Sequence, residues 1–388
     1  MAKLIDITGK VVSGEWGTTD ESGDGIPVLR TTNFTNEGAI DFCDVITRTI
    51  IKKNIDEKYL RQGDIIIEKS GGSDKQPVGR VVYFNGPEKT YLFNNFTGLL
   101  RVKDQKNWYP KYVFYSLYFN YLRGGTRVFE SKTTGLHNLR INDFVSRYEV
   151  PETNIAEQKK ICELLDRLSN IVRKRKQELQ MMDELIKARF VEMFGDPILN
   201  THSLQTVELQ QLGSWGSGGT PSRKNNEYFK GNIDWYSAGE LNSQYLKKSK
   251  EKITQQAIEN SATQLLPSGS LLVGMYDTAA FKMGVLTKES SCNQACAFLI
   301  PNYSVNVVWL YHELSLMKPY FLQQRHGVRQ NNLNLGMIKK FMVPIVDIND
   351  QNVFVNFVQQ VDKSKAAIQK SIDETQLLYD SLMQKYFG

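Results

Sequence analysis

The sequence contains no long apolar segment and few residues of the kinds that bind metals. No uninterrupted run approaches the roughly 18 apolar residues that cross a bilayer, and the first ten residues, MAKLIDITGK, lack a signal-peptide core. We therefore expect a soluble, cytoplasmic protein with no membrane partner. Of the four cysteines only Cys292 and Cys296 lie close together, and no histidine lies beside them. Reduced thiols are expected, and no metal site is predicted.

Catalytic motifs are also missing. There is no Asn/Asp-Pro-Pro-aromatic tetrad of a methyltransferase, and no glycine-rich loop follows a strand to hold S-adenosylmethionine. The segment Lys69–Lys75 lacks the GxxxxGK[ST] order of a phosphate-binding loop, so a flexible polar loop is predicted there. Glu68 and Lys69 are adjacent and would point to opposite faces of a strand, which argues against a metal-dependent nuclease. We predict no catalytic residue and no cofactor bound by this chain.

The charge is mildly basic. The formal net charge is +6, and the basic excess lies in residues 1–150 and 196–345 rather than in the segments that follow each of them. A modest positive charge on these two parts is compatible with a polyanionic partner.

The chain repeats itself once. Val150-Pro151 with Ile155-Ala156-Glu157-Gln158 recurs as Val343-Pro344 with Ile348-Asn349-Asp350-Gln351, and this offset of 193 residues holds to Phe194-Gly195 and Phe387-Gly388. Upstream the offset is larger and varies, since Gly63 corresponds to Gly269 at an offset of 206 and Leu139 corresponds to Leu333 at an offset of 194. Surface loops tolerate insertions and packed helices do not, so each half is a head of variable length followed by a tail of fixed length. The predicted parts are a first head (1–150), a central helix (151–195), a second head (196–345) and a C-terminal helix (346–388).

The tails are predicted to be long helices that pair as a coiled coil. Asn154 with Glu157, and Asp347 with Asp350, have the spacing of a capping box. Apolar residues then recur every seven positions in two neighbouring rows, which Arg175 interrupts in the first tail and Lys365 in the second. The rows comprise Leu165, Val172, Leu179 and Ile186, with Ile161, Leu168 and Met182, and in the second tail Phe354, Val361 and Ile368, with Val358, Ile372 and Tyr379.

The heads are predicted to be mixed and strand-rich. Short β-branched runs at residues 64–67, 79–83 and 270–273 are bounded by glycine, proline and asparagine, and helices are expected near Tyr112–Leu122 and Val308–Leu322. The fold class is therefore α+β, with two strand-rich α/β heads separated by two long antiparallel coiled-coil helices.

Polar loops recur at equivalent places in the two heads. Arginine, asparagine and glutamine pair with guanine and adenine edges, and threonine and histidine contact phosphates or bases, so these loops could contact nucleic acid. An asparagine-rich turn that only braces the fold is an equally good interpretation. The predicted DNA-binding residues are Lys69, Ser70, Ser73, Lys75, Lys132, Thr133, Thr134, His137, Asn138 and Arg140 in the first head, and Arg223, Tyr276, Lys282, Arg325, Arg329, Gln330, Asn331 and Asn334 in the second.

The whole chain resembles the specificity subunits of type I restriction–modification enzymes. The resemblance is carried by the helix start from Pro151 to Ile161, the helix end from Ala188 to Pro197, and the segments Ser217–Ser222, Asn293-Gln294 and Asn332–Leu335. It implies two target-recognition domains, each reading one half of a split, asymmetric DNA site. It also implies helices that set the spacing and dock two methylation subunits, with restriction subunits joining the core. S-adenosylmethionine, ATP and Mg²⁺ are then expected in the partner subunits.

Two other functions remain open at this point. One is a coiled-coil adaptor that binds proteins or RNA, and the other is a stand-alone DNA methyltransferase or nuclease. A salt-dependent preference for one duplex sequence would argue against the adaptor, and cofactor binding by the isolated chain would favour the enzyme.

Overall fold

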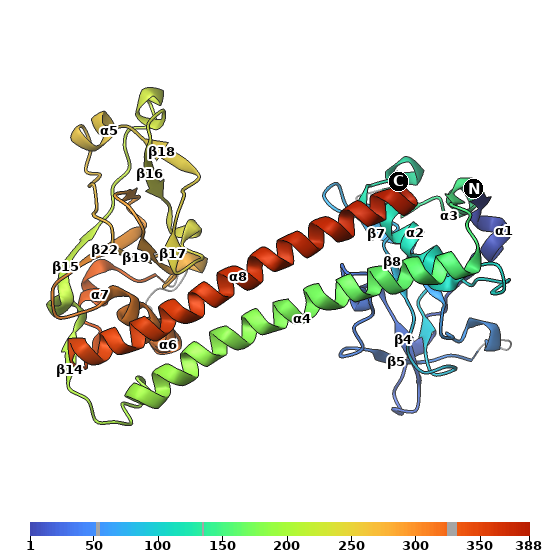
Figure 1. The fold of residues 1–388 in the computed structure, drawn as a ribbon, viewed down its shortest axis with the longest axis horizontal. Coiled ribbons are helices and arrows are strands. Elements are labelled where there is room, and N and C mark those ends of the chain that lie inside the picture. The colour runs from blue at the N-terminus through green and yellow to red at the C-terminus, as the bar shows by residue number, and fades with distance from the viewer. Residues whose placement is uncertain (52–54, 134–135, 324–331) are drawn as a thin grey trace. The chain divides into compact units, whose positions relative to one another are not determined.

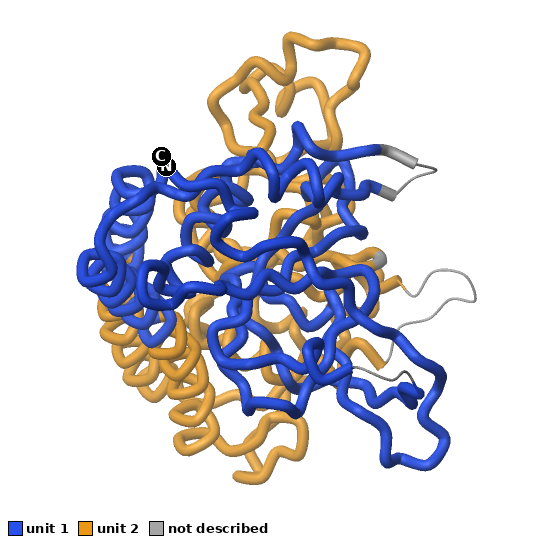
Figure 2. Tube along the Cα trace, turned by 90° about the vertical axis from the view of Figure 1, so that its right-hand side faces the viewer, with its two compact units in different colours: residues 1–175, 370–388 blue, residues 176–369 orange. Residues whose placement is uncertain are grey.

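The computed structural model describes residues 1–51, 55–133, 136–323 and 332–388, which form two compact units. Unit 1 comprises Met1–Arg175 with Lys370–Gly388, and unit 2 comprises Lys176–Gln369 (Figure 2). Each unit thus contains one head and half of each long helix, and both chain ends belong to unit 1.

Unit 1 is built from short strands in four sheets. The central sheet has the order β2 (Val12–Ser13), β10 (Thr97–Leu100), β6 (Ile65–Glu68), β8 (Val81–Tyr83), all antiparallel. A second sheet has the order β3 (Thr18–Thr19), β5 (Ile46–Thr49), β4 (Ile26–Leu29), β9 (Leu92–Phe93). A third has the order β11 (Glu130–Thr133), β12 (Leu136–Leu139), β7 (Ser70–Gly72). The fourth is the pair β1 (Ala2–Lys3) and β13 (Glu149–Val150). Its shorter helices are α1 (Leu4–Thr8), α2 (Pro110–Leu122) and α3 (Ile141–Arg147).

Unit 2 has a five-stranded central sheet. Its order is β15 (Gly213–Ser217), β22 (Cys296–Pro301), β19 (Leu271–Gly274), β20 (Met283–Leu286), β17 (Tyr245–Leu246). Beside it are the sheet β18 (Glu251–Ile253), β16 (Ile233–Tyr236), β21 (Ser291–Cys292) and the pair β14 (Thr206–Glu208), β23 (Met342–Pro344). The shorter helices are α5 (Gln255–Glu259), α6 (Val307–Gln323) and α7 (Leu335–Lys339).

The two heads share one topology, as the sequence repeat predicts. The order β2-β10-β6-β8 in unit 1 matches β15-β22-β19-β20 in unit 2. In both units a parallel pair, β4 with β9 or β16 with β21, carries an antiparallel neighbour on its other side. A terminal pair of strands then connects each head to its long helix. The fold class predicted from the sequence is therefore confirmed.

The head helices α2 and α6 pack inside their units. Tyr112 and Val113 of α2 are 1% and 0% exposed, and Trp309 and Leu310 of α6 are fully buried. A helix with apolar residues on most of its faces is stable only when neighbours cover it on several sides, which explains why aromatic residues gather in these two segments. The helices predicted near residues 112–122 and 308–322 are thus confirmed as α2 and α6, and their aromatic residues form core.

Two 40-residue helices, α4 (Ile155–Phe194) and α8 (Ile348–Phe387), follow the heads (Figure 1). At 1.5 Å per residue each is about 60 Å long. In unit 1, Ile161 and Leu165 of α4 share a core with Met383 of α8, and in unit 2, Phe190 of α4 shares a core with Phe354 of α8. The beginning of each helix therefore packs against the end of the other, which confirms the antiparallel arrangement.

The two polar interruptions of the apolar rows form contacts between the helices. In unit 1, Arg175 donates from Nη1 to the carbonyl of Ser371 at 3.0 Å and to Oγ1 of Thr375 at 3.2 Å. In unit 2, Nζ of Lys365 lies 2.6 Å from Oδ1 of Asp183. Each polar interruption thus provides a cation that reaches the other helix.

Candidate nucleic-acid interface

In unit 1 the two polar segments predicted to bind DNA lie next to each other. Strand β7 pairs with β12, so that Gly72 lies opposite His137 and Ser70 lies opposite Asn138. The N–H of Leu139 also donates to the carbonyl of Lys69 at 2.8 Å. Strands β7, β12 and β11 therefore form one sheet. The prediction of a flexible loop at Lys69–Lys75 is wrong for Ser70–Gly72, because their backbone pairs with β12.

His137 is buried within this sheet. It is 5% exposed, and its Nδ1 lies 3.0 Å from Oε2 of Glu130. Oε1 of Glu130 accepts the N–H of Val78 at 2.9 Å, and Nε2 of His137 lies 3.5 Å from Asp74. The imidazole therefore braces the hairpin against the neighbouring loop, and the structure gives it an internal role.

The other predicted residues of unit 1 are more accessible. Ser73 and Lys75 are exposed, and Ser70 and Asn138 are half-buried. Arg140 is half exposed and donates from Nη2 to the carbonyl of Val128 at 2.7 Å, so it also braces the turn before β11. Lys132 and Thr133 have backbone positions in β11, whereas their side chains, together with Thr134, lie outside the described residues.

Lys69 borders an open hollow that sequence reasoning missed. Its Nζ donates to Oγ of Ser13 at 2.7 Å, and burial together with the charge of Lys58 lowers the pKa of Lys69. Ser13, Trp16, Lys58 and Asn95 line the hollow, whose volume is about 700 Å³. These residues come from a strand, a short 3-10 helix and two loops, and nothing in their sequence spacing signals that they are neighbours.

In unit 2 an equivalent backbone contact joins the corresponding segments. The N–H of Leu333 donates to the carbonyl of Met275 at 2.8 Å, as Leu139 does to Lys69 in unit 1. Tyr276 is 40% exposed beside this contact. Asn334 is exposed, but its Oδ1 accepts the N–H of Met337 at 2.9 Å and so caps α7.

Two further predicted residues of unit 2 have internal partners. Lys282 donates from Nζ to Oδ1 of Asn242 at 2.9 Å. Arg223 contacts both carboxylate oxygens of Glu251 at 2.5 and 2.8 Å, and its guanidinium lies over the rings of Phe229 and Trp235. It lies beside the small sheet β18-β16-β21, whereas Tyr276 follows the central sheet. The predicted residues Arg325, Arg329, Gln330 and Asn331 lie outside the described residues.

The part of the chain that the structure describes contains no group of three or more His, Cys, Asp or Glu residues placed to hold a metal ion, and no helix long and apolar enough to span a membrane. Cys292 and Cys296 are buried, and a hydrogen bond with Cys292 together with burial raises the pKa of Cys296. Since the thiolate is the reactive form, this thiol is held in its unreactive state.

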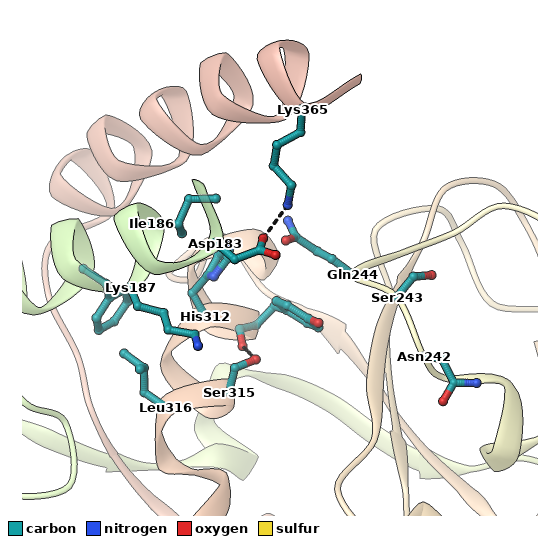
Figure 3. Close-up of a pocket in the computed structure, with 12 residues that line it drawn as sticks. Asp183, Ile186, Lys187, Asn242, Ser243, Gln244, His312, Ser315, Leu316 and Lys365 are labelled. Carbon is teal, nitrogen blue, oxygen red and sulfur yellow. Dashed lines mark hydrogen bonds and ion pairs between the residues drawn. The ribbon is translucent and has the colours of Figure 1, made fainter. Parts of the chain in front are cut away.

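Unit 2 also contains a polar cavity of about 490 Å³ next to the Asp183–Lys365 ion pair (Figure 3). The cavity is lined by Lys187 of α4, by His312 of α6 and by Gln244, which precedes β17. Burial and the charge of Lys365 lower the pKa of His312 to about 4, so the imidazole is neutral at pH 7. The cavity therefore combines a neutral histidine with a paired cation and anion. Ser315 also lines it, and its hydroxyl donates to the carbonyl of Tyr311 one helical turn earlier at 2.6 Å.

Comparison with known proteins gives one family for both halves of the chain. The model of the type I restriction modification DNA specificity domain matches residues 3–181 and again residues 202–375. The type I restriction enzyme EcoR124I/EcoR124II specificity subunit of Escherichia coli is 23% identical over 220 residues, which cover 55% of this chain and 53% of that protein. The MjaIX specificity subunit of Methanocaldococcus jannaschii is 21% identical over 160 residues, 40% of this chain and 37% of that protein. The chain thus aligns with about half the length of the first of these relatives and with less of the second.

Solved structures show the same fold. The S subunit of a type I restriction–modification system from M. genitalium has a TM-score of 0.59 at 14% identity, covering 100% of this chain and 95% of that one. A structure described as concerning complex assembly and conformational transition of the type I R-M system has a TM-score of 0.61 at 14% identity, covering 100% and 96%. At this identity the likeness concerns the fold alone.

Proposed function

Because this chain belongs to the type I restriction modification DNA specificity family, we propose that it is the DNA sequence-recognition subunit of such a complex and has no catalytic site of its own. Each head reads one half of a bipartite, asymmetric DNA site. The long helices set the spacing between half-sites and dock methylation subunits. Restriction subunits then join this core, and S-adenosylmethionine, ATP and Mg²⁺ bind to the partners. The complex acts in the cytoplasm.

The observation that carries this proposal is the duplication of a head whose scaffold is kept while its surface differs. The central sheets and the Leu139 and Leu333 contacts are equivalent in the two units. The side chains at matching places are not, since Lys69 and Ser70 in one head correspond to Met275 and Tyr276 in the other. Two copies of one scaffold that present different side chains are suited to reading two different base sequences.

Exposed apolar residues on the long helices support docking of a pair of partner subunits. Leu185 on α4 and Leu378 on α8 are equivalent in the repeat, and each is 50% exposed. Leu164 and Ile171 continue the row on α4, at 37% and 39% exposure. The positions equivalent to Leu164 and Ile171 on α8 are Phe357 and Ser364, so Leu185 and Leu378 are the pair among these that recurs on both helices. Exposed apolar side chains on a helix are typical of a partner-binding surface, which we assign to the methylation subunits.

The test is to select duplexes from a random pool with the purified full-length chain, at several salt concentrations. We expect enrichment of one split sequence, with an affinity that falls steeply as salt rises. The same preparation should neither bind S-adenosylmethionine nor transfer methyl groups. A chain that transfers methyl groups alone would overturn the non-catalytic assignment, and a chain that enriches no duplex would overturn DNA reading.

A further inference from the structure

Each head contains one turn that is held in the same way in both units. In unit 1 the N–H of Asn94 donates to the end of β4 at 3.0 Å, and the N–H of Thr97 donates to the carbonyl of Asn94 at 3.1 Å. In unit 2 the N–H of Asn293 donates to the end of β16 at 2.9 Å, and the N–H of Cys296 donates to the carbonyl of Asn293 at 3.0 Å. The turn joins the parallel strand pair to the central sheet in both heads.

A glycine lets a second segment pass close to this turn. A Cβ on Gly14 would lie 2.2 Å from the carbonyl oxygen of Asn94, and one on Gly218 would lie 2.3 Å from that of Asn293. Only a residue without a side chain fits at such a distance. The backbone beyond each glycine then bonds to the strand end just before the turn, from Glu15 N–H to the carbonyl of Phe93 at 2.8 Å and from Gly219 N–H to that of Cys292 at 3.0 Å. The turn is therefore fixed from two sides.

The first amide of the turn is structural, whereas the second is presented to solvent. Asn94 is 4% exposed, and its Oδ1 accepts the hydroxyl of Thr97 at 3.2 Å. Asn95 and Gln294, the next residues in the two heads, are both exposed. Oε1 of Gln294 accepts a hydrogen bond from the hydroxyl of Thr220. A rigid turn that presents a primary amide at the same place in both heads meets the geometric requirement for reading a base edge.

We propose that Asn95 and Gln294 are base-reading residues, each contacting the edge of an adenine in the major groove of its own half-site. The oxygen of an asparagine or glutamine amide accepts a hydrogen bond from adenine N6, and its nitrogen donates one to adenine N7. No other base presents this donor and acceptor side by side in the major groove. This assignment rests on the proposed function of the chain as a reader of duplex DNA.

The surroundings of Asn95 have the chemistry that such a contact needs. Asn95 lines the hollow that also contains Lys58, and Lys69 lies at its edge through its bond to Ser13. Lys58 is ion-paired with Glu15 in the same hollow, whereas Lys69 beside the exposed amide can position the phosphate backbone while the amide reads the base. Phe96, the next residue, is 52% exposed, so the turn also presents an aromatic ring for apolar contact with bases.

The test compares Asn95→Ala and Gln294→Ala in the full-length chain, using duplexes in which every base pair of the selected site is changed in turn. Asn95→Asp, which keeps the shape and loses the N–H donors, is the conservative variant. Asn142→Ala and Gln256→Ala are matched controls, since both residues are exposed amides on head helices.

We expect each test variant to lose about 5- to 150-fold of the preference for adenine at one position of one half-site. The preferences at the other half-site, and those of the controls, should stay as in the wild type.

Other outcomes separate this inference from the proposed function. A variant whose affinity falls by the same factor for every duplex, and depends less steeply on salt, would show that the side chain contacts a phosphate. That result would overturn base reading. Full retention of the adenine preference would overturn it too. The unchanged half-site reports folding of each variant within the same measurement. A wild-type chain without any sequence preference would instead remove the proposed function, and this assignment with it.

Discussion

Gln158 accepts the backbone N–H of Tyr109 on its Oε1 at 2.8 Å, which links the first turn of α4 to the first turn of α2. Its Nε2 donates to the carbonyls of Asn107 and Thr153 at 2.9 and 2.8 Å, and the side chain is fully buried. Gln351 repeats this arrangement in unit 2, where it accepts the N–H of Asn306 at 2.7 Å and is also fully buried. The two glutamines recur in the sequence because each joins a head to its long helix.

Replacing Gln158 with leucine is therefore expected to destabilise unit 1. The change leaves one N–H and two carbonyl groups without their partner in a buried place, which should cost about 2–4 kcal/mol of unfolding free energy. Gln351→Leu should act equally on unit 2. Urea denaturation measures both, with Gln177→Leu as the control, since Gln177 is exposed on the same helix. Equal stabilities of Gln158→Leu and Gln177→Leu would contradict this role.

The polar interruptions of the helix rows are expected to determine pairing rather than stability. Polar residues at core positions of a coiled coil specify register and oligomeric state at some cost in stability. The double variant Arg175→Leu/Lys365→Leu should therefore melt at a higher temperature than the wild type and form additional oligomers. Analytical ultracentrifugation and thermal melting report the two effects. Arg173→Leu/Lys363→Leu alters exposed positions of the same helices and serves as the control. A double variant that stays a single species but melts earlier would show that these contacts stabilise the pair.

The architecture was predictable from the sequence to a greater extent than the interface. Heptad rows and a fixed offset depend on local periodicity, and α4 and α8 follow them closely. The capping oxygen of Asn154 accepts the N–H of Glu157 at 2.9 Å as expected, whereas Asp347 accepts the N–H of Asn349 at 2.8 Å, one residue earlier than its predicted partner Asp350. Such details depend on the turn geometry of each helix start.

Side-chain accessibility at the predicted interface depends on contacts between distant segments, which composition does not reveal. His137 belongs to a segment predicted as a polar loop, yet it lies in strand β12, and Glu130 and Asp74 enclose it. Arg223 is engaged by Glu251, 28 residues further along the chain. Asn95, in the turn between β9 and β10, and Lys58, at the end of a short 3-10 helix, line one hollow although 36 residues separate them. The sequence predicted correctly that Lys75 lies in a polar loop, and contact of Lys75 or Tyr276 with DNA remains a prediction.

Glu313→Gln is expected to stabilise unit 2 at neutral pH. The carboxyl is 1% exposed, its Oε1 has no hydrogen-bond partner among the described residues, and burial raises its pKa well above the usual value of 4.5. The folded state therefore holds a proton that the unfolded chain releases, so the contribution of Glu313 to stability is greatest below pH 4.5 and is lost as pH rises. The gain from glutamine should grow by up to about 1.4 kcal/mol per pH unit above 4.5. Denaturation at pH 4 to 8 measures it, with exposed Glu289→Gln as the control. A pH-independent gain would contradict the assignment.

His312 should act in the opposite direction. Its folded pKa of about 4 lies below the usual 6.5, so the unfolded chain takes up a proton between these values and the folded chain does not. This contribution to stability is present above pH 6.5 and is lost as pH falls to about 4, by at most about 3 kcal/mol. His312→Gln should flatten the acid side of the stability curve. If the slope between pH 6.5 and 4 were identical in the variant, another group would be responsible.

Matched insertions in the two long helices should change the gap between half-sites and leave the half-site bases unchanged. Seven residues added within Lys174–Glu178, and seven within the equivalent residues 367–371, keep both apolar rows in register because the repeat of the rows is seven. Each insertion lengthens its helix by about 10 Å, which corresponds to roughly three base pairs at 3.4 Å each. Three base pairs also turn the duplex by roughly a third of its 10.5-base-pair repeat, so affinity should fall while the new gap is still preferred.

Duplex selection with the altered chain, or sequencing of methylated sites in cells that contain its partners, gives both the gap and the bases. An insertion in α4 alone shifts its rows against α8 and should prevent folding or assembly, which makes it the control. Unchanged spacing in the doubly extended chain, or altered bases within either half-site, would show that the helices do not set the gap.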